Sequence, residues 1–163
     1  MGAIAHHVDE SRAWRLPDWA RENVQGYQPV RYDAVGKRLI VANDFILAMA
    51  SHGRKFFRYV GKNDGVNRVA WLERDIKGKL WHHDDYSMKR IYVSCRQHAW
   101  HGFSHGGTLR AVVCCLVEFV RTGKQLMIGG SHWGYGVDEM AKVVDAGLKL
   151  GALSENPGDL SRD

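Results

Sequence analysis

The sequence has little proline and cysteine and no long hydrophobic run. Its 163 residues include three prolines and three cysteines. The odd number of cysteines, two of them adjacent at Cys114 and Cys115, does not fit a disulfide framework and favours a reducing compartment. Charged residues interrupt the most apolar run, 109–120, well before the ~18 residues of a membrane span. The apolar stretch at 2–5 is too short for a signal-peptide core, so we expect a cytoplasmic protein with no membrane partner.

The bulk composition is that of a globular domain. Hydrophobic residues make up 45% and charged residues 25% of the chain, which excludes long disordered or coiled-coil architecture. The length allows one domain, which we place at 1–153, followed by a polar and flexible tail at 154–163. Neither half shows an internal repeat or a low-complexity tract.

The order of local patterns predicts an α+β fold. Near the N-terminus we expect short helices at 17–24 and 45–52, with a strand at 37–41 between them. Aromatic and β-branched runs separated by Asp-Gly and Lys-Gly turns in 54–96 predict an antiparallel meander of about four strands. Apolar periodicity ending at glycine predicts two C-terminal helices that pack against this sheet, at 108–122 and 137–150.

The charge is concentrated in one segment. The net charge is +5, yet 54–96 alone holds eleven basic and five acidic residues, so the rest of the chain is close to neutral. Basic and aromatic side chains on one sheet face are typical of surfaces that hold phosphates and stack bases. The alternative is a solvated outer face that binds nothing. The candidate residues for binding nucleic acid or a partner are Arg54, Lys55, Arg58, Arg68, Lys79, Lys89 and Arg90.

Histidines cluster in two short stretches that suggest metal chemistry. Cys95, His98, His101 and His105 are closely spaced, and His and Cys are good zinc ligands. This spacing predicts a zinc site, and the alternative is that these residues have simple hydrogen-bonding or capping roles.

The second stretch lies in the preceding hairpin and suggests a metal-dependent nuclease or another hydrolase. The residues from His82 to Asp85 would act together with the cluster from Cys95 to His105. His83, or else His82, would serve as the base. Asp84, or else Asp85, and His105 would hold the metal.

Two glycine-rich loops precede the two C-terminal helices. HGFSHGG at 101–107 and GGSHWGYG at 129–136 can expose free backbone N–H groups at a helix start, although neither matches a known phosphate-binding motif. Tight structural loops are the alternative. If the two helix starts lie together, the loops would form one pocket lined by Trp100, His101, His105, His132, Trp133 and Tyr135.

The C-terminal two-thirds of the chain resembles small uncharacterised proteins of bacteriophages and prophages. The segments that carry the resemblance are RDIKGKLWHHDDYSMKRIY, FSHGGTLR, EFVRTGKQL and WGYGVDEM. The resemblance implies a bacterial host cytoplasm and an accessory role in host takeover or against host defence. It implies no catalytic residue.

Together these observations predict a binding module for a host protein or a nucleic acid, and the alternative is the metal-dependent nuclease or hydrolase.

Overall fold

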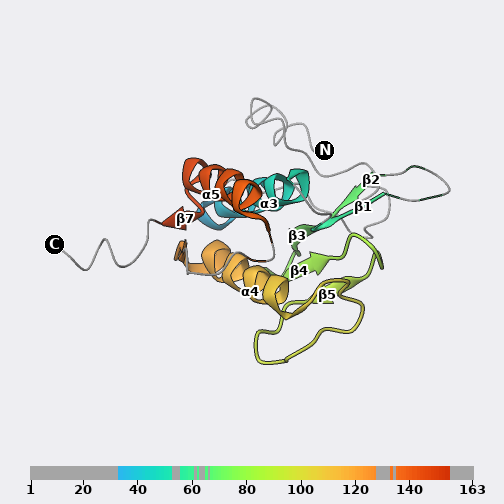
Figure 1. The fold of residues 1–163 in the computed structure, drawn as a ribbon. Helices are drawn as coiled ribbons and strands as arrows, with labels where there is room; N and C mark the ends of the chain where they lie inside the picture. The colour runs from blue at the N-terminus through green and yellow to red at the C-terminus, as the bar shows by residue number, and fades with distance from the viewer. Residues whose placement is uncertain are drawn as a thin grey trace.

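The computed structural model describes residues 33–52, 56–60, 62, 65, 67–127, 133 and 135–154. Its elements run α3 (Ala34–Ser51), β1 (Arg58–Val60), β2 (Asn67–Val69), β3 (Trp71–Arg74), β4 (Leu80–His83), β5 (Arg90–Tyr92), α4 (Gly107–Thr122), β6 (Leu126–Met127), α5 (Val137–Leu150) and β7 (Leu153–Ser154). Helix α3 packs against α5, α4 and β3, and the strands β1–β5 lie at one end of the helices (Figure 1). The predicted α+β class is therefore confirmed. Within the described part of the chain, no helix is long and apolar enough to cross a membrane.

The first described helix is longer than the sequence pattern predicts. Residues 37–41, predicted as a strand, lie inside the eighteen-residue α3 together with the predicted 45–52 helix. The side chain of Asp33 begins the helix by accepting a hydrogen bond from the Gly36 N–H at 2.8 Å. The strand prediction was wrong because Ile40 and its neighbours read as β-branched and apolar, whereas they are the buried face of a helix. The predicted helix at 17–24 lies outside the described residues.

The two C-terminal helices are confirmed. Helix α4 ends at Gly123 and α5 ends at Gly151, both in the left-handed conformation that stops a helix. The Arg38 side chain of α3 donates from Nε to the Val120 carbonyl at 2.9 Å, so it neutralises the negative end of α4. Within α5, a Cβ on Gly147 would stand 2.5 Å from Leu153 and 2.9 Å from Phe45, so only glycine lets α5 approach this close.

The predicted meander consists of two sheets. Strands β1 and β2 form a separate antiparallel hairpin, while β3, β4 and β5 form a three-stranded antiparallel sheet in that order. In the second sheet Trp71 lies opposite His83, and His83 lies opposite Arg90. A further short parallel pair, β6 with β7, includes Ser154, which was predicted to begin the tail. Residues 155–163 lie outside the described part.

One face of the three-stranded sheet is part of the core. Leu72, Leu80 and Ile91 are buried there among the apolar side chains of α3 and α4. Strand β3 is an edge strand of this sheet, so its backbone groups at Leu72 have no neighbouring strand to bond. The side chain of the buried Asn43 in α3 takes the place of that strand. It donates to the Leu72 carbonyl at 2.9 Å and accepts from the Leu72 N–H at 2.7 Å.

Candidate functional site

The outer face of the β3–β5 sheet carries a chain of charged and aromatic contacts. His83 stacks on Trp71 with the ring centroids 3.9 Å apart, and its Nε2 lies 2.7 Å from Glu73 Oε1. Arg90 donates to both oxygens of Glu73 at 2.8 and 3.1 Å. The same guanidinium lies 3.9 Å from the centre of the Trp81 ring. Glu73 is therefore bonded to both His83 and Arg90, whereas Lys79 of the same face lies over the Tyr92 ring.

The pKa shifts on this face follow from burial and from these contacts. Burial lowers the pKa of His83, and the Glu73 carboxylate only partly opposes this effect. Burial by itself raises the pKa of Glu73, but hydrogen bonds from His83 and Arg90 outweigh it and leave that pKa below its ordinary value. Glu73, His83 and Arg90 therefore form a closed network, beside which the buried Trp71 Nε1 has no hydrogen-bond partner among the described residues.

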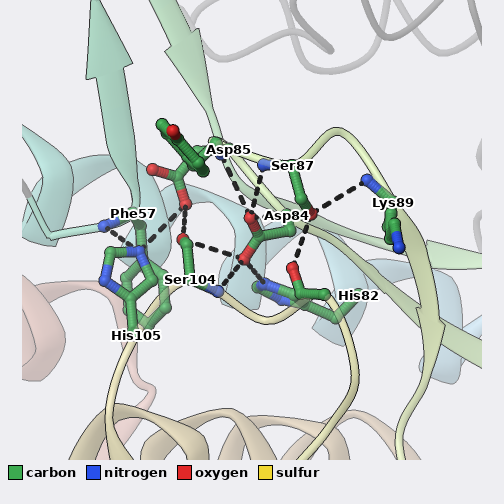
Figure 2. Close-up of polar contacts among 10 residues, drawn as sticks. Phe57, His82, Asp84, Asp85, Ser87, Lys89, Ser104 and His105 are labelled. Atoms are coloured by element: carbon green, nitrogen blue, oxygen red, sulfur yellow. Dashed lines mark hydrogen bonds and ion pairs between the residues drawn. The ribbon is translucent and has the colours of Figure 1, made fainter.

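Asp84 directly follows β4, and its carboxylate connects the 84–87 turn to the 102–105 loop (Figure 2). Its Oδ2 accepts from the backbone N–H groups of Tyr86 and Ser87, at 3.1 and 2.9 Å. Its Oδ1 accepts from the Ser104 N–H at 2.8 Å and lies 3.0 Å from the Ser104 hydroxyl. Ser87 in turn donates from its hydroxyl to the Gly102 carbonyl. Asp84 thus fixes the 102–105 loop against the 84–87 turn.

Beside Asp84 lies His82, which is fully buried. Its Nε2 is 3.9 Å from Asp84 Oδ1, too far for a hydrogen bond, and among the described residues neither ring nitrogen has a hydrogen-bond partner. Burial lowers its pKa to about 3, although the Asp84 charge opposes the shift. His82 is therefore neutral at physiological pH and packs edge-on between the rings of Phe57 and Phe103.

Asp85 forms a second imidazole–carboxylate pair, with His105. His105 Nε2 lies 2.9 Å from Asp85 Oδ1, and the two side chains are 12% and 2% exposed. The backbone N–H of Phe57 also points to this Nε2 at 3.1 Å, as Figure 2 shows. Phe57 has a φ of 59°, which is uncommon for a residue other than glycine. His105 therefore touches both the strained start of β1 and a buried carboxylate.

A cleft opens over this second pair. It has a volume of about 720 Å³ and lies between the β1–β2 hairpin, the 84–87 turn and the 102–105 loop. We call it the hairpin cleft; it is lined by Arg58, Tyr59, Val60, Lys62, Asp85, Tyr86, Gly102, Phe103, Ser104 and His105. The Tyr59 and Tyr86 rings meet edge to face at 5.0 Å, and the Arg68 guanidinium lies 5.6 Å from the Tyr59 ring.

The predicted basic residues separate onto different surfaces. Arg58 and Arg68 belong to the hairpin beside the cleft. Lys79 and Arg90 accompany Trp81 and Tyr92 on the outer sheet face. Lys89 contacts the 101–102 turn, with its Nζ 3.1 Å from His101 Nε2. Arg54 and Lys55 lie outside the described residues.

The predicted metal and catalytic sets do not assemble as proposed. Across the described chain, no three His, Cys, Asp or Glu side chains are placed to hold a metal ion, so Cys95, His98, His101 and His105 are not brought together. The expected base His83 lies on the outer face with Glu73 and does not reach Asp84 or His105. Adjacent residues of a strand point to opposite faces, so His83 and the neighbouring His82 have different surroundings.

The predicted common pocket of the two glycine loops is also not formed. Trp100 and Tyr135 are buried in the core, where the Tyr135 hydroxyl donates to the Met49 carbonyl at 2.8 Å. Trp133 packs on Phe45 and lines a separate groove of about 260 Å³ along α4. His101 lies on the surface, and His105 alone of this set lines the hairpin cleft. His132 lies outside the described residues.

Several residues of the cleft were not singled out from the sequence as lining it. Tyr59, Lys62 and Tyr86 were seen only as members of a basic and aromatic segment. Asp85 was only an alternative ligand, because its pairing with His105 joins residues twenty positions apart. The sequence indicated this region only by the many basic and aromatic residues in 54–96.

Comparison with known proteins identifies the family. The chain is 28% identical, over 120 residues, to the SPbeta prophage-derived uncharacterized protein YoqU of Bacillus subtilis (strain 168). That similarity covers 72% of this chain and 83% of the Bacillus protein, and it confirms the resemblance to prophage proteins. No solved structure matches the chain. The model of the YoqU family matches residues 34–159, which is most of the sequence, and the chain therefore belongs to the YoqU family.

Proposed function

We propose that this protein binds single-stranded nucleic acid in the hairpin cleft, within the host cell of a phage or prophage. The observation that carries the proposal is that two cations, Arg58 and Lys62, and two tyrosines, Tyr59 and Tyr86, line one open cleft. Cations hold the phosphate backbone and aromatic rings stack on bases, which is the combination that single-strand binding proteins use.

The state of these side chains supports a binding role. Arg58 Nε is buried and, among the described residues, has no hydrogen-bond partner, so a phosphate oxygen would satisfy it. Tyr86 is 63% exposed, which leaves its ring free to stack. The contrast with Arg90 is direct, because Arg90 is already bonded to Glu73.

The size of the cleft favours a single strand over a duplex. A volume of about 720 Å³ is in the range of pockets that enclose one small ligand, here a nucleotide. In a duplex the bases are stacked on each other and cannot reach the tyrosine rings. We therefore expect RNA or DNA to bind only where bases are unpaired.

The test is a fluorescence-anisotropy titration with labelled single-stranded RNA and DNA of mixed sequence, at several salt concentrations. We expect affinity to fall with salt, because phosphate contacts release counterions. A duplex of the same sequence should bind more weakly. Salt-independent affinity, or no binding at low salt, would contradict the proposal.

Charge reversal locates the binding surface. Arg58→Glu and Lys62→Glu should each weaken binding about tenfold, since each loses an attraction and adds a repulsion. Lys142→Glu is the matched control, because it makes the same charge change at an exposed position of α5, which packs on α3. It should change affinity less than about twofold. Equal losses in all three variants would show that only net charge matters.

A further inference from the structure

The floor of the hairpin cleft holds groups that a purely binding surface does not need. Asp85 is almost wholly buried, yet its carboxylate meets His105 and not one of the cleft cations. A buried carboxylate paired with an imidazole is the arrangement that orients a histidine for proton transfer. The pair lies in the same cleft as Arg58 and Lys62.

The contacts of His105 determine which nitrogen is basic. A neutral imidazole carries one proton, so Nε2 can donate to Asp85 or accept from the Phe57 N–H, but not both. The charge of the carboxylate makes the bond to Asp85 the stronger of the two. With its proton on Nε2, His105 keeps a lone pair on Nδ1, which makes no hydrogen bond within the described part of the chain.

Ser104 does not compete for the role of nucleophile. Its hydroxyl lies 3.0 Å from Asp84 Oδ1 and 3.5 Å from Asp85 Oδ1. It makes no bond to His105 among the described contacts, so the imidazole does not activate it. The nucleophile must therefore come from the bound molecule or from water.

We propose that the hairpin cleft cleaves RNA, with His105 as the general base and Asp85 as the residue that positions it. This inference rests on the proposed binding of single-stranded nucleic acid. An RNA strand supplies its own nucleophile, the 2′-hydroxyl, next to the phosphate that Arg58 and Lys62 would hold. DNA lacks this hydroxyl and would bind without being cut.

The step balances without any further reactant. His105 Nδ1 takes the proton of the 2′-hydroxyl, the 2′-oxygen forms a bond to phosphorus, and the bond from phosphorus to the 5′-oxygen breaks. The leaving 5′-oxygen takes a proton from water, and the imidazolium returns its proton to the resulting hydroxide. The products are a 2′,3′-cyclic phosphate and a 5′-hydroxyl. Arg58 and Lys62 would stabilise the negative charge that builds on the phosphate oxygens.

The experiment measures cleavage and binding on the same preparations of the full chain. Labelled single-stranded RNA and its all-deoxy counterpart are incubated with the protein in the presence of a metal chelator, and the ends of the products are identified. We expect cleavage of the RNA alone, with 2′,3′-cyclic phosphate ends. His105→Ala should lower the rate by about a hundredfold or more, with RNA affinity changed less than about twofold, and added imidazole should restore part of it.

Two further variants separate positioning from folding. Asp85→Asn should lower kcat by about tenfold or more and leave KM nearly unchanged, because the neutral amide no longer stabilises the protonated imidazole while the phosphate contacts stay the same. His101→Ala is the control, since this surface histidine contacts Lys89 and does not line the cleft. It should cleave at the rate of the unmodified protein.

The outcomes distinguish the two proposals. RNA binding without cleavage would overturn the ribonuclease inference and leave the binding proposal standing, whereas absence of binding would overturn both. Cleavage of the deoxy strand, or cleavage only after a divalent cation is added, would contradict the role of the 2′-hydroxyl and the metal-free step. An unchanged rate in His105→Ala or Asp85→Asn would reject the role of that residue.

Discussion

The outer sheet face and the hairpin cleft are built from the same kinds of side chain. Each has cations, exposed aromatic rings and one imidazole–carboxylate pair, Glu73 with His83 or Asp85 with His105. On the outer face Arg90 binds both oxygens of Glu73, and His83 is stacked beneath Trp71. In the cleft the second pair lies at the floor of an open space beside cations that are not bonded to it.

The same residue types therefore do not by themselves make a binding site. A carboxylate that bonds an arginine and a histidine at once has no charge left for a ligand, so the outer network contributes to stability. Asp85 bonds His105 and the Ser104 hydroxyl but no cation, so Arg58 and Lys62 of the cleft stay available to another molecule. Substitution of one residue in each imidazole–carboxylate pair tests whether the two surfaces differ in this way.

The largest loss of stability is expected from a substitution on the outer face. Glu73→Ala should lower the free energy of unfolding by about 3 kcal/mol, because it leaves the buried His83 without its hydrogen-bond partner and removes both bonds of Arg90 to the carboxylate. Urea denaturation measures the change. Glu118→Ala, which removes an exposed carboxylate from α4, should stay within about 0.5 kcal/mol. A loss in Glu73→Ala no larger than in Glu118→Ala would contradict the closed-network description.

A smaller effect should come from the buried His82, whose Nε2 lies 3.9 Å from Asp84 Oδ1. Its pKa of about 3 in the folded state lies far below its value of 6.5 when unfolded. Protons therefore bind the unfolded chain first as the pH falls below 6.5, and stability is lost in that range. Between pH 7 and pH 5 the loss from this residue is about 2 kcal/mol. His82→Leu should flatten this part of the pH profile of stability, whereas an unchanged profile would show that His82 is protonated in the folded protein.

The smallest effect on stability should be that of Asp85→Asn. The amide oxygen can still accept from His105 and Ser104, so the free energy of unfolding should change by less than about 1 kcal/mol. Thermal or urea unfolding of this variant beside Glu73→Ala gives the two numbers directly. A loss as large as that of Glu73→Ala would mean that both pairs serve the fold.

Much of the fold follows from local sequence patterns. The C-terminal helices end at glycines that adopt positive φ, as Gly123 and Gly151 do, and those signals are local. The error at 37–41 has a tertiary cause, because burial against three neighbours favours a helix over the β-propensity of Leu39, Ile40 and Val41. The meander divides into two sheets at Ala70, between β2 and β3, where no turn residue in the sequence signals a break.

The candidate site was only partly predictable. The basic and aromatic character of 54–96 marked the region, and His105, one of the predicted site residues, lines the cleft. The sequence could not show which of the adjacent Asp84 and Asp85 pairs with His105, because the two differ only in the direction of their side chains. Asp84 bonds backbone N–H groups, and Asp85 faces His105. Which histidine of the His82–His83 pair lies in the core depended on the strand register.

The most direct test of this account compares one lysine from each surface. Lys62 lines the cleft and Lys79 lies beside Tyr92 on the outer face, both are exposed, and replacement of either by Glu makes the same change of charge. Anisotropy titration with labelled single-stranded RNA should show about a tenfold loss of affinity for Lys62→Glu and less than about a twofold loss for Lys79→Glu. An equal loss, or a larger loss for Lys79→Glu, would contradict the assignment of nucleic-acid binding to the hairpin cleft.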